Sequence, residues 1–346
     1  MWLMLPFYVT VMLTHSLNVV ISCLYMFGFF STMRVTLGFV YMLEFIPKRQ
    51  HAMITTVFSL QVPMLTLFST FYFSVLTDYW FALGCVGLGF LLICDFGIIK
   101  ISESPKWLLK NKRAEEAQQV LLAVAKANRV EVETQSDGLI QRVSELLLPD
   151  AGEISEVKGD KTTFIEYLKL KEVWLNLLCM ALIWTSASFN TYLVLFQLKY
   201  FPGNIFINTT ASAVSDVLAF TASGVVVQKL GIKWTLFGSF VMGLVGGLAI
   251  VFQTSGGKAP IGWLFPFLVL FSKFGISSAY NICYLSNSML FPAKISATTM
   301  GICNTFARTA CILAPLMAEF ELPLPMIIFT ALCAMASLAS LFLIQK

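Results

Sequence analysis

Long apolar segments recur along this chain, and they constrain its fold more than any other feature of the sequence. About 20 apolar residues in a helix cross the ~30 Å hydrocarbon layer of a bilayer. Apolar segments, the first of them short, lie near residues 1–15, 17–43, 53–76, 79–100, 172–198, 205–227, 232–252, 260–290, 296–318 and 322–344. The sequence therefore predicts an all-α integral membrane protein with about ten transmembrane helices, four followed by six.

The composition supports this class. Hydrophobic residues make up 58% of the 346 residues and charged residues only 12%, whereas about a quarter of the residues in a soluble domain are charged. The net charge of +4 is too small for a nucleic-acid-binding surface, so the expected partner is the lipid bilayer and not nucleic acid. The eight cysteines form no C-x-x-C pair, and we interpret them as buried apolar side chains rather than metal ligands or disulfides.

Positive charges are unequally distributed between the two sides that the predicted helices define. If the chain starts inside, 18 of the 23 Lys and Arg residues fall in inner loops, two in outer loops and three within helices. Because the loops of membrane proteins keep their positive charges on the cytoplasmic side, we expect both termini in the cytoplasm.

A charged segment at residues 101–171 interrupts the apolar pattern. Ser104 followed by Pro105 is typical of a helix start, with Ser as the cap and Pro at the first position. The sequence AEEAQQVLLAVAKANR then places apolar residues at helical spacing on one face. The predicted domains are an amino-terminal bundle of four helices at 1–100, a cytoplasmic amphipathic linker at 101–171 and a carboxy-terminal six-helix bundle at 172–346.

Four stretches together form a signature. They are ESPKWLLKNKRAEEAQQVLLAVAKANR from Glu103, TLGFVYMLEF at 36–45, PGNIFIN at 202–208, and the segment from SKFGISSAYNICYLSNSML to APLM at 272–317. They resemble the major facilitator superfamily, and within it the branch of organic cation, organic anion and carnitine transporters. The resemblance covers essentially the whole chain. It implies a secondary transporter of small organic ions in the plasma membrane that works by alternating access.

The resemblance also implies departures from the family's pattern. The chain starts at about the third of the family's twelve helices, so we expect the first two to be missing. Gln228, Met289 and Ser296 stand where the family has Asp, Glu and Arg. Residues that match or lie near the family's inner-gate ion pairs, and that we expect to act in gating, are Glu44, Arg49, Glu103 and Lys106.

Five charged residues lie inside the predicted membrane helices: Arg34, Asp95, Asp216, Lys273 and Arg308. Each costs roughly 2.5–3.5 kcal/mol at a helix centre, so it must pair or face a water-filled cavity. We expect Lys273, Arg308 and Asp216 to face a cavity and Asp95 to form an ion pair between helices. Arg34 fits either interpretation.

Polar and aromatic residues accompany these charges at helical spacing. Lys273, Ser277, Tyr280 and Tyr284 share one face of a predicted helix. Two interpretations stay open, because such stripes line aqueous paths and also form interhelical hydrogen bonds. The predicted substrate-binding residues are Trp184, Tyr192, Asp216, Lys273, Ser277, Tyr280, Tyr284 and Arg308.

Arg308 bears on the charge of the substrate. In the family that the chain resembles, this position of the eleventh helix tends to be Asp in cation carriers and Arg in anion and carnitine carriers. Cations in a cavity attract carboxylates, so we predict small organic anions or zwitterions as substrates.

Other functional classes have less support. The chain has no Gly-x-Ser-x-Gly, phosphate loop or metal-ligand spacing, so we predict no enzyme, no cofactor and no metal site. A sugar porter would carry a Gln-Leu-Ser motif and a Pro-Glu-Thr-Lys-Gly tail, both missing here. A truncated, non-transporting member of the same family stays an alternative. The sequon at Asn208 lies close to the membrane, and we expect it to be unglycosylated.

Overall fold

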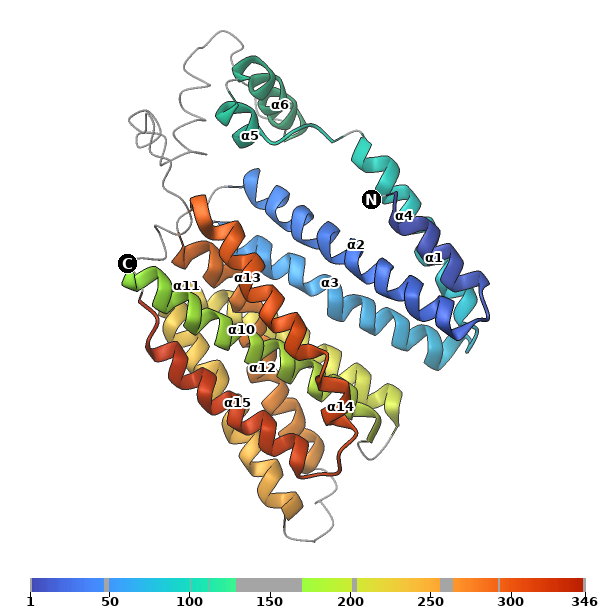
Figure 1. Ribbon diagram of the computed structural model, residues 1–346, viewed down its shortest axis with the longest axis vertical. Coiled ribbons are helices and arrows are strands. Elements are labelled where there is room, and N and C mark those ends of the chain that lie inside the picture. The colour runs from blue at the N-terminus through green and yellow to red at the C-terminus, as the bar shows by residue number, and fades with distance from the viewer. Residues whose placement is uncertain are drawn as a thin grey trace. The chain divides into compact units, whose positions relative to one another are not determined.

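The computed structural model of the chain describes residues 2–46, 50–99, 101–111, 113–128, 170–200, 204–255, 264–291 and 293–344. Most of these residues lie in helices, and no strand occurs among them. Figure 1 shows the helices in chain order from blue to red. The predicted all-α class is confirmed.

Eight helical segments in the described part of the chain are long and apolar enough to span a membrane. They are built from α2 (Leu17–Glu44), α3 (His51–Phe71) with the π turn Tyr72–Leu76, α4 (Trp80–Ile99), α10 (Lys171–Gln197) with the 3-10 turn Leu198–Tyr200, α11 (Ile205–Ser255), α12 (Leu264–Leu290), α13 (Ala293–Cys311) with the short α14 (Ala314–Ala318), and α15 (Leu324–Leu341).

Two places in the chain bear on the predicted number of membrane helices. α11 joins two predicted membrane helices at Gly231, whose φ of 76° interrupts the helical geometry. Glycine adopts this backbone conformation without the steric penalty that a Cβ brings. The first predicted membrane helix, at residues 1–15, is only the ten-residue α1 (Met4–Leu13). At 1.5 Å per residue it is about 15 Å long, which agrees with the expectation that the first apolar segment is short.

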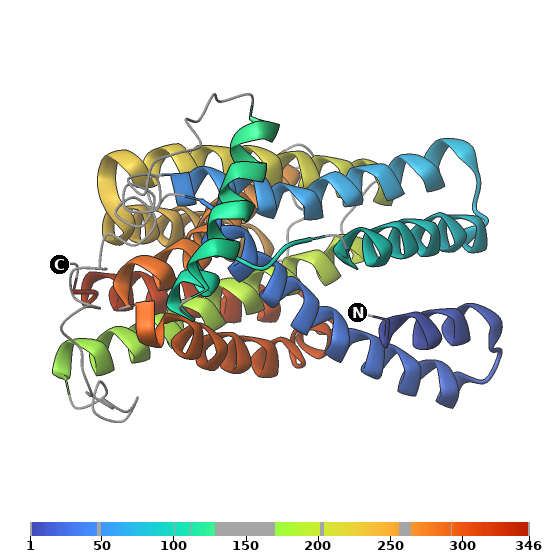
Figure 2. The ribbon, with the colours of Figure 1, turned by 90° about the horizontal axis from the view of Figure 1, so that it is seen from above.

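The chain divides into two compact units. The first comprises Met1–His51 and Thr77–Asp160. Within it α1 folds back along α2, as Figure 2 shows. The Tyr8 hydroxyl of α1 donates a hydrogen bond to the Gly84 carbonyl of α4 over 3.0 Å. These contacts hold the short helix against two membrane helices.

The predicted linker helix forms within the first unit. The Ser104 hydroxyl accepts a hydrogen bond from the Trp107 amide, and Pro105 begins α5 (Pro105–Lys110), so the predicted helix start is confirmed. Ala117, on the apolar face of α6 (Ala114–Ala127), is buried, while Val124 at the end of that face is exposed. Residues 129–169 of the predicted linker lie outside the described residues.

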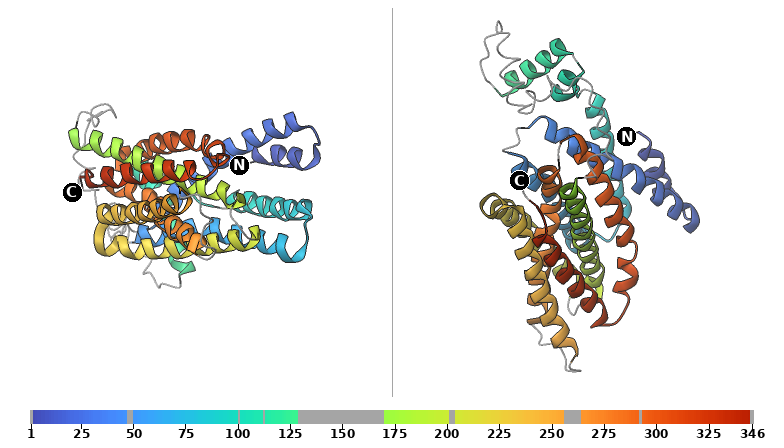
Figure 3. Two further views of the ribbon diagram at one scale, coloured as in Figure 1. Left: turned by 90° about the horizontal axis from the view of Figure 1, so that it is seen from below. Right: turned by 60° about the vertical axis from the view of Figure 1, so that its left-hand side comes forward.

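The second unit comprises Ala52–Leu76 and Lys161–Lys346. Glycines allow its helices to approach closely, as is common in membranes. A Cβ on Gly275 of α12 would lie 2.5 Å from the Ser239 carbonyl oxygen of α11, and one on Gly246 would lie 2.9 Å from the Cα of Ser272. The second half of α11 therefore runs directly against α12 (Figure 3).

α3 belongs to this second unit. A Cβ on Gly224 of α11 would collide with the Thr56 hydroxyl of α3, so α3 and the first half of α11 also approach closely. The predicted domain boundaries at residues 100 and 171 stay a prediction.

The cysteines differ partly from their predicted environment. Cys179, Cys283, Cys303 and Cys333 are buried within the second unit, whereas Cys85 and Cys94 of α4 are exposed. The prediction of burial is therefore wrong for the two α4 residues, because the outward face of a membrane helix is as apolar as its packed face.

We predict that Gly275→Ala destabilises the second unit. The added methyl group would overlap the backbone of α11, and overpacking of this kind costs about 1–3 kcal/mol. Gly238→Ala is the matched control, because nothing lies within 4 Å of a Cβ at Gly238 in the same bundle. Thermal unfolding in detergent should give a lower Tm for Gly275→Ala only; equal Tm values for the two variants would contradict the packing described here.

Candidate functional site

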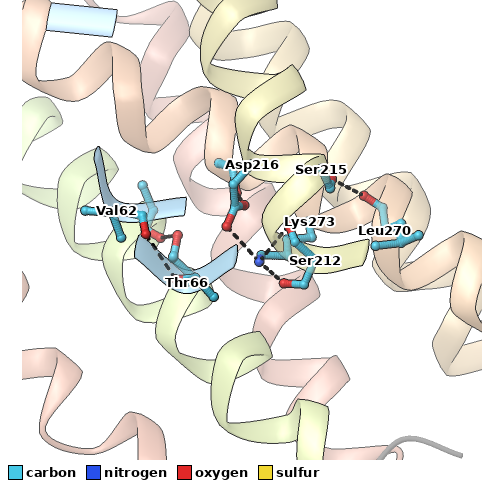
Figure 4. Close-up of polar contacts among 10 residues, drawn as sticks. Val62, Thr66, Ser212, Ser215, Asp216, Leu270 and Lys273 are labelled. Carbon is cyan, nitrogen blue, oxygen red and sulfur yellow. Dashed lines mark hydrogen bonds and ion pairs between the residues drawn. The ribbon is translucent and has the colours of Figure 1, made fainter. Parts of the chain in front are cut away.

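Lys273 of α12 is buried and fully hydrogen-bonded to α11. Its side chain is 3% exposed, and its Nζ lies 2.9 Å from Asp216 Oδ2. Nζ also donates to the Ser212 hydroxyl and, over 3.3 Å, to the Ser212 carbonyl oxygen. An ammonium group has three N–H donors, so these three acceptors satisfy it. Figure 4 shows the ammonium group between Ser212 and Asp216.

Asp216 is the open member of this ion pair. Its side chain is 20% exposed, and its Oδ1 accepts a hydrogen bond from the Ser277 hydroxyl over 2.6 Å. Each carboxylate oxygen can accept a further hydrogen bond. Lys273 therefore pairs with a carboxylate of the neighbouring helix α11. The sequence analysis left such pairing open, beside the expectation that Lys273 faces a cavity. Its role in substrate binding stays a prediction.

Arg308 of α13 contacts α10 without an acidic partner. Its Nη1 donates to the Tyr192 hydroxyl over 2.7 Å, and its guanidinium carbon lies 5.9 Å from the centroid of the Tyr192 ring. None of the ion pairs among the described residues includes Arg308, and its side chain is exposed. Because a neutral phenol does not cancel a guanidinium charge, Arg308 keeps its positive charge and several free N–H donors.

Aromatic side chains of α10 and α12 lie near this arginine. Trp184 is fully buried, and its ring contacts that of Tyr284 edge-on, with centroids 4.8 Å apart. The hydroxyls of Tyr280 and Tyr284 lie 3.2 Å apart. The hydroxyls of Tyr192, Tyr280 and Tyr284 are all within electrostatic range of Arg308. The structure thus brings these predicted site residues together where α10, α12 and α13 meet.

α12 connects the ion pair with the aromatic group. Ser277, bonded to Asp216, and Tyr280, next to Arg308, are three residues apart on α12. Residues at that spacing are neighbours on one helix face, about 4.5 Å apart along the axis. Asp216 and Arg308 therefore flank one stripe of α12, and the sequence spacing had predicted the residues of that stripe.

Sequence reasoning missed buried amides in the same helices. Asn281 of α12 donates to the Ser223 hydroxyl over 3.0 Å, and Asn190 of α10 donates to the Phe329 carbonyl over 3.2 Å. The carbonyl oxygens of both side chains are buried and accept no hydrogen bond in the described structure. An Asn within an apolar segment is a signal of the same kind as a charge, but a weaker one, because an amide is cheaper to bury.

Arg34 and Asp95, the two charges predicted within membrane helices of the first unit, have no counter-ion among the described residues. Asp95 is 3% exposed, and its Oδ1 and Arg34 Nη1 are buried without a hydrogen bond within the described part of the chain. The ion pair expected for Asp95 is absent among the ion pairs of the described residues.

The predicted gating residues are only partly described. Glu44 of α2 is half-buried and Glu103 is exposed, and both carboxylates lie within electrostatic range of the Tyr41 hydroxyl. That hydroxyl donates to the Ser102 carbonyl over 2.6 Å. Arg49 lies outside the described residues, and only the backbone of Lys106 is described. The gating roles stay a prediction.

Comparison with known protein families decides the identity. Residues 1–315 match the family model described as Major Facilitator Superfamily. The chain belongs to this superfamily. It is thus a multi-pass membrane protein of a family of transporters and not of enzymes, which confirms the fold class and the family that the sequence signature indicated.

Three relatives place this member of the superfamily near the organic ion transporters. It is similar to the organic cation transporter protein of Drosophila melanogaster, with 27% identity over 76% of this chain and 47% of the relative. Human solute carrier family 22 member 13 is 26% identical over 75% and 44% of the two chains. Human organic cation/carnitine transporter 2 is 24% identical over 70% and 42%. The chain spans less than half of the length of these relatives.

A solved structure supports the fold. The proton:xylose symporter XylE of the superfamily, solved with 6-bromo-6-deoxy-D-glucose bound, superposes with a TM-score of 0.73, covering 99% of this chain and 77% of the symporter. At 15% identity this similarity shows the fold alone.

We predict that the Asp216–Lys273 pair couples α11 to α12. Lys273→Met would leave a carboxylate without its counter-ion between apolar helices, and breaking a buried pair in this way costs about 3–5 kcal/mol. The double variant Asp216→Asn/Lys273→Met should lose less stability than the sum of the two single variants. Thermal unfolding in detergent measures this coupling, and strictly additive losses would contradict a direct pair.

Proposed function

We propose that this protein is a secondary transporter of small organic ions that carry a carboxylate, either anions or zwitterions. The supporting observation is the uncompensated charge of Arg308, which bonds the Tyr192 hydroxyl and lies within electrostatic range of the Tyr280 and Tyr284 hydroxyls. A guanidinium group binds a carboxylate through two parallel N–H donors. Neighbouring phenols add hydrogen-bond donors without adding negative charge.

The aromatic rings suit the organic part of such a substrate. Trp184 and Tyr284 meet edge-on, and Tyr280 meets Tyr284 in the same way, with centroids 5.6 Å apart. Ligand pockets combine aromatic walls of this kind with a few polar groups that fix orientation. Trp184 and the three tyrosines would therefore hold the apolar body while Arg308 holds the carboxylate.

The names of the relatives support a small charged organic molecule as the substrate. Two of them are named as transporters of organic cations, one of these also of carnitine, and carnitine carries both a carboxylate and a quaternary ammonium group. From these names we infer only the general class of the substrate of this protein, a small charged organic molecule.

Transport would follow alternating access, in which two helical bundles rock around a central site. Under this proposal Glu44, Arg49, Glu103 and Lys106 form cytoplasmic gate contacts, both termini lie in the cytoplasm and the protein resides in the plasma membrane. The distribution of positive residues in the loops supports this orientation.

Uptake of radiolabelled substrates into proteoliposomes tests the proposal, with small monocarboxylates, zwitterions and quaternary amines as the three probes. Wild-type vesicles should take up a monocarboxylate or a zwitterion faster than empty vesicles do. Arg308→Gln should lower the uptake of carboxylates about tenfold or more, because a charge-assisted hydrogen bond of roughly 1.5–3 kcal/mol is lost.

Arg113→Gln is the control for this prediction, because it removes an exposed cation of the linker that pairs with Glu116. Its uptake should equal that of the wild type. Uptake no greater than in empty vesicles for all three probes would contradict the proposed function and favour the non-transporting alternative.

A further inference from the structure

Three charged side chains of the second unit lie near one face of α12. Two cations, Lys273 and Arg308, and one acid, Asp216, lie along the same stripe of α12. Lys273 has no free donor, since Asp216 and Ser212 accept all three of its N–H groups. Arg308 has no acidic partner among the described residues.

We infer that Asp216 is a specificity-determining residue, which cancels the charge of Lys273 so that the site binds substrates with one carboxylate and rejects those with two. The inference rests on the proposed function and adds to it the number of charges that the substrate carries. With Asp216 present, one uncompensated cation is left, Arg308. Without Asp216, two cations would face the stripe.

The hydrogen bonds of Asp216 fix the position of its negative charge. The Ser277 hydroxyl donates to Oδ1 over 2.6 Å and Lys273 bonds Oδ2 over 2.9 Å, so the carboxylate is held between two helices in one orientation. Asp216 is 20% exposed and bonds Ser277, so under this inference a substrate beside Ser277 would lie near the carboxylate. A second substrate carboxylate there would meet a like charge at short range, which is strongly unfavourable in surroundings of low dielectric constant.

The two single variants of the pair should shift selectivity in opposite directions. Asp216→Asn should raise the uptake of a dicarboxylate relative to a monocarboxylate of the same carbon skeleton about tenfold, because Lys273 gains a free charge. Lys273→Met should instead raise the uptake of a quaternary amine relative to the monocarboxylate. In Asp216→Asn/Lys273→Met the net charge of the wild type returns, and so should its uptake ratios. A merely structural pair would lower all uptake rates together and leave the ratios unchanged.

Arg113→Gln is the control, because it removes an exposed cation of the linker and leaves Asp216, Lys273 and Arg308 unchanged, so its ratios should equal those of the wild type. A competition assay on the wild type needs no variant to fold: a dicarboxylate should inhibit monocarboxylate uptake no better than a second monocarboxylate. Tenfold stronger inhibition by the dicarboxylate, or an unchanged ratio in Asp216→Asn, would overturn the inference. In either case wild-type uptake that depends on Arg308 would leave the proposed function intact.

Discussion

A polar group that faces lipid must find a partner within the chain, because lipid tails offer neither hydrogen bonds nor counter-charges. The backbone meets this demand by forming helices, which most of the described residues do. The few ionisable side chains meet it in different ways. Lys273 is satisfied completely by Asp216 and Ser212, whereas Arg308 is hydrogen-bonded but keeps its charge. The difference between these two cations carries the functional argument.

Close helix packing places the charged groups in the second unit. Gly246 and Gly275 allow the second half of α11 to lie against α12. On the first half of α11, Ser212 and Asp216 form hydrogen bonds with Lys273 and Ser277 of α12. A small-residue interface and a polar interface thus fix the same helix. α12 then presents Tyr280 and Tyr284 toward Trp184 and Arg308, so its orientation determines the composition of the candidate site.

Helical periodicity predicted much of this arrangement. The stripe of Lys273, Ser277, Tyr280 and Tyr284 follows from spacing within one helix, and the start of α5 follows from the capping preference of Ser104. Pairing between helices does not follow from spacing, because a stripe that lines a cavity and a stripe that bonds a neighbour have the same period.

The sequence by itself determined that this is a helical membrane protein, where its crossing segments lie within a few residues, and which family it resembles, because apolar runs and local motifs are properties of consecutive residues. Only the tertiary structure decided that Lys273 bonds Asp216 while Arg308 bonds Tyr192. These contacts join residues 57 and 116 positions apart. Which partner each charge finds depends on how α10, α11, α12 and α13 pack, and no local pattern records that.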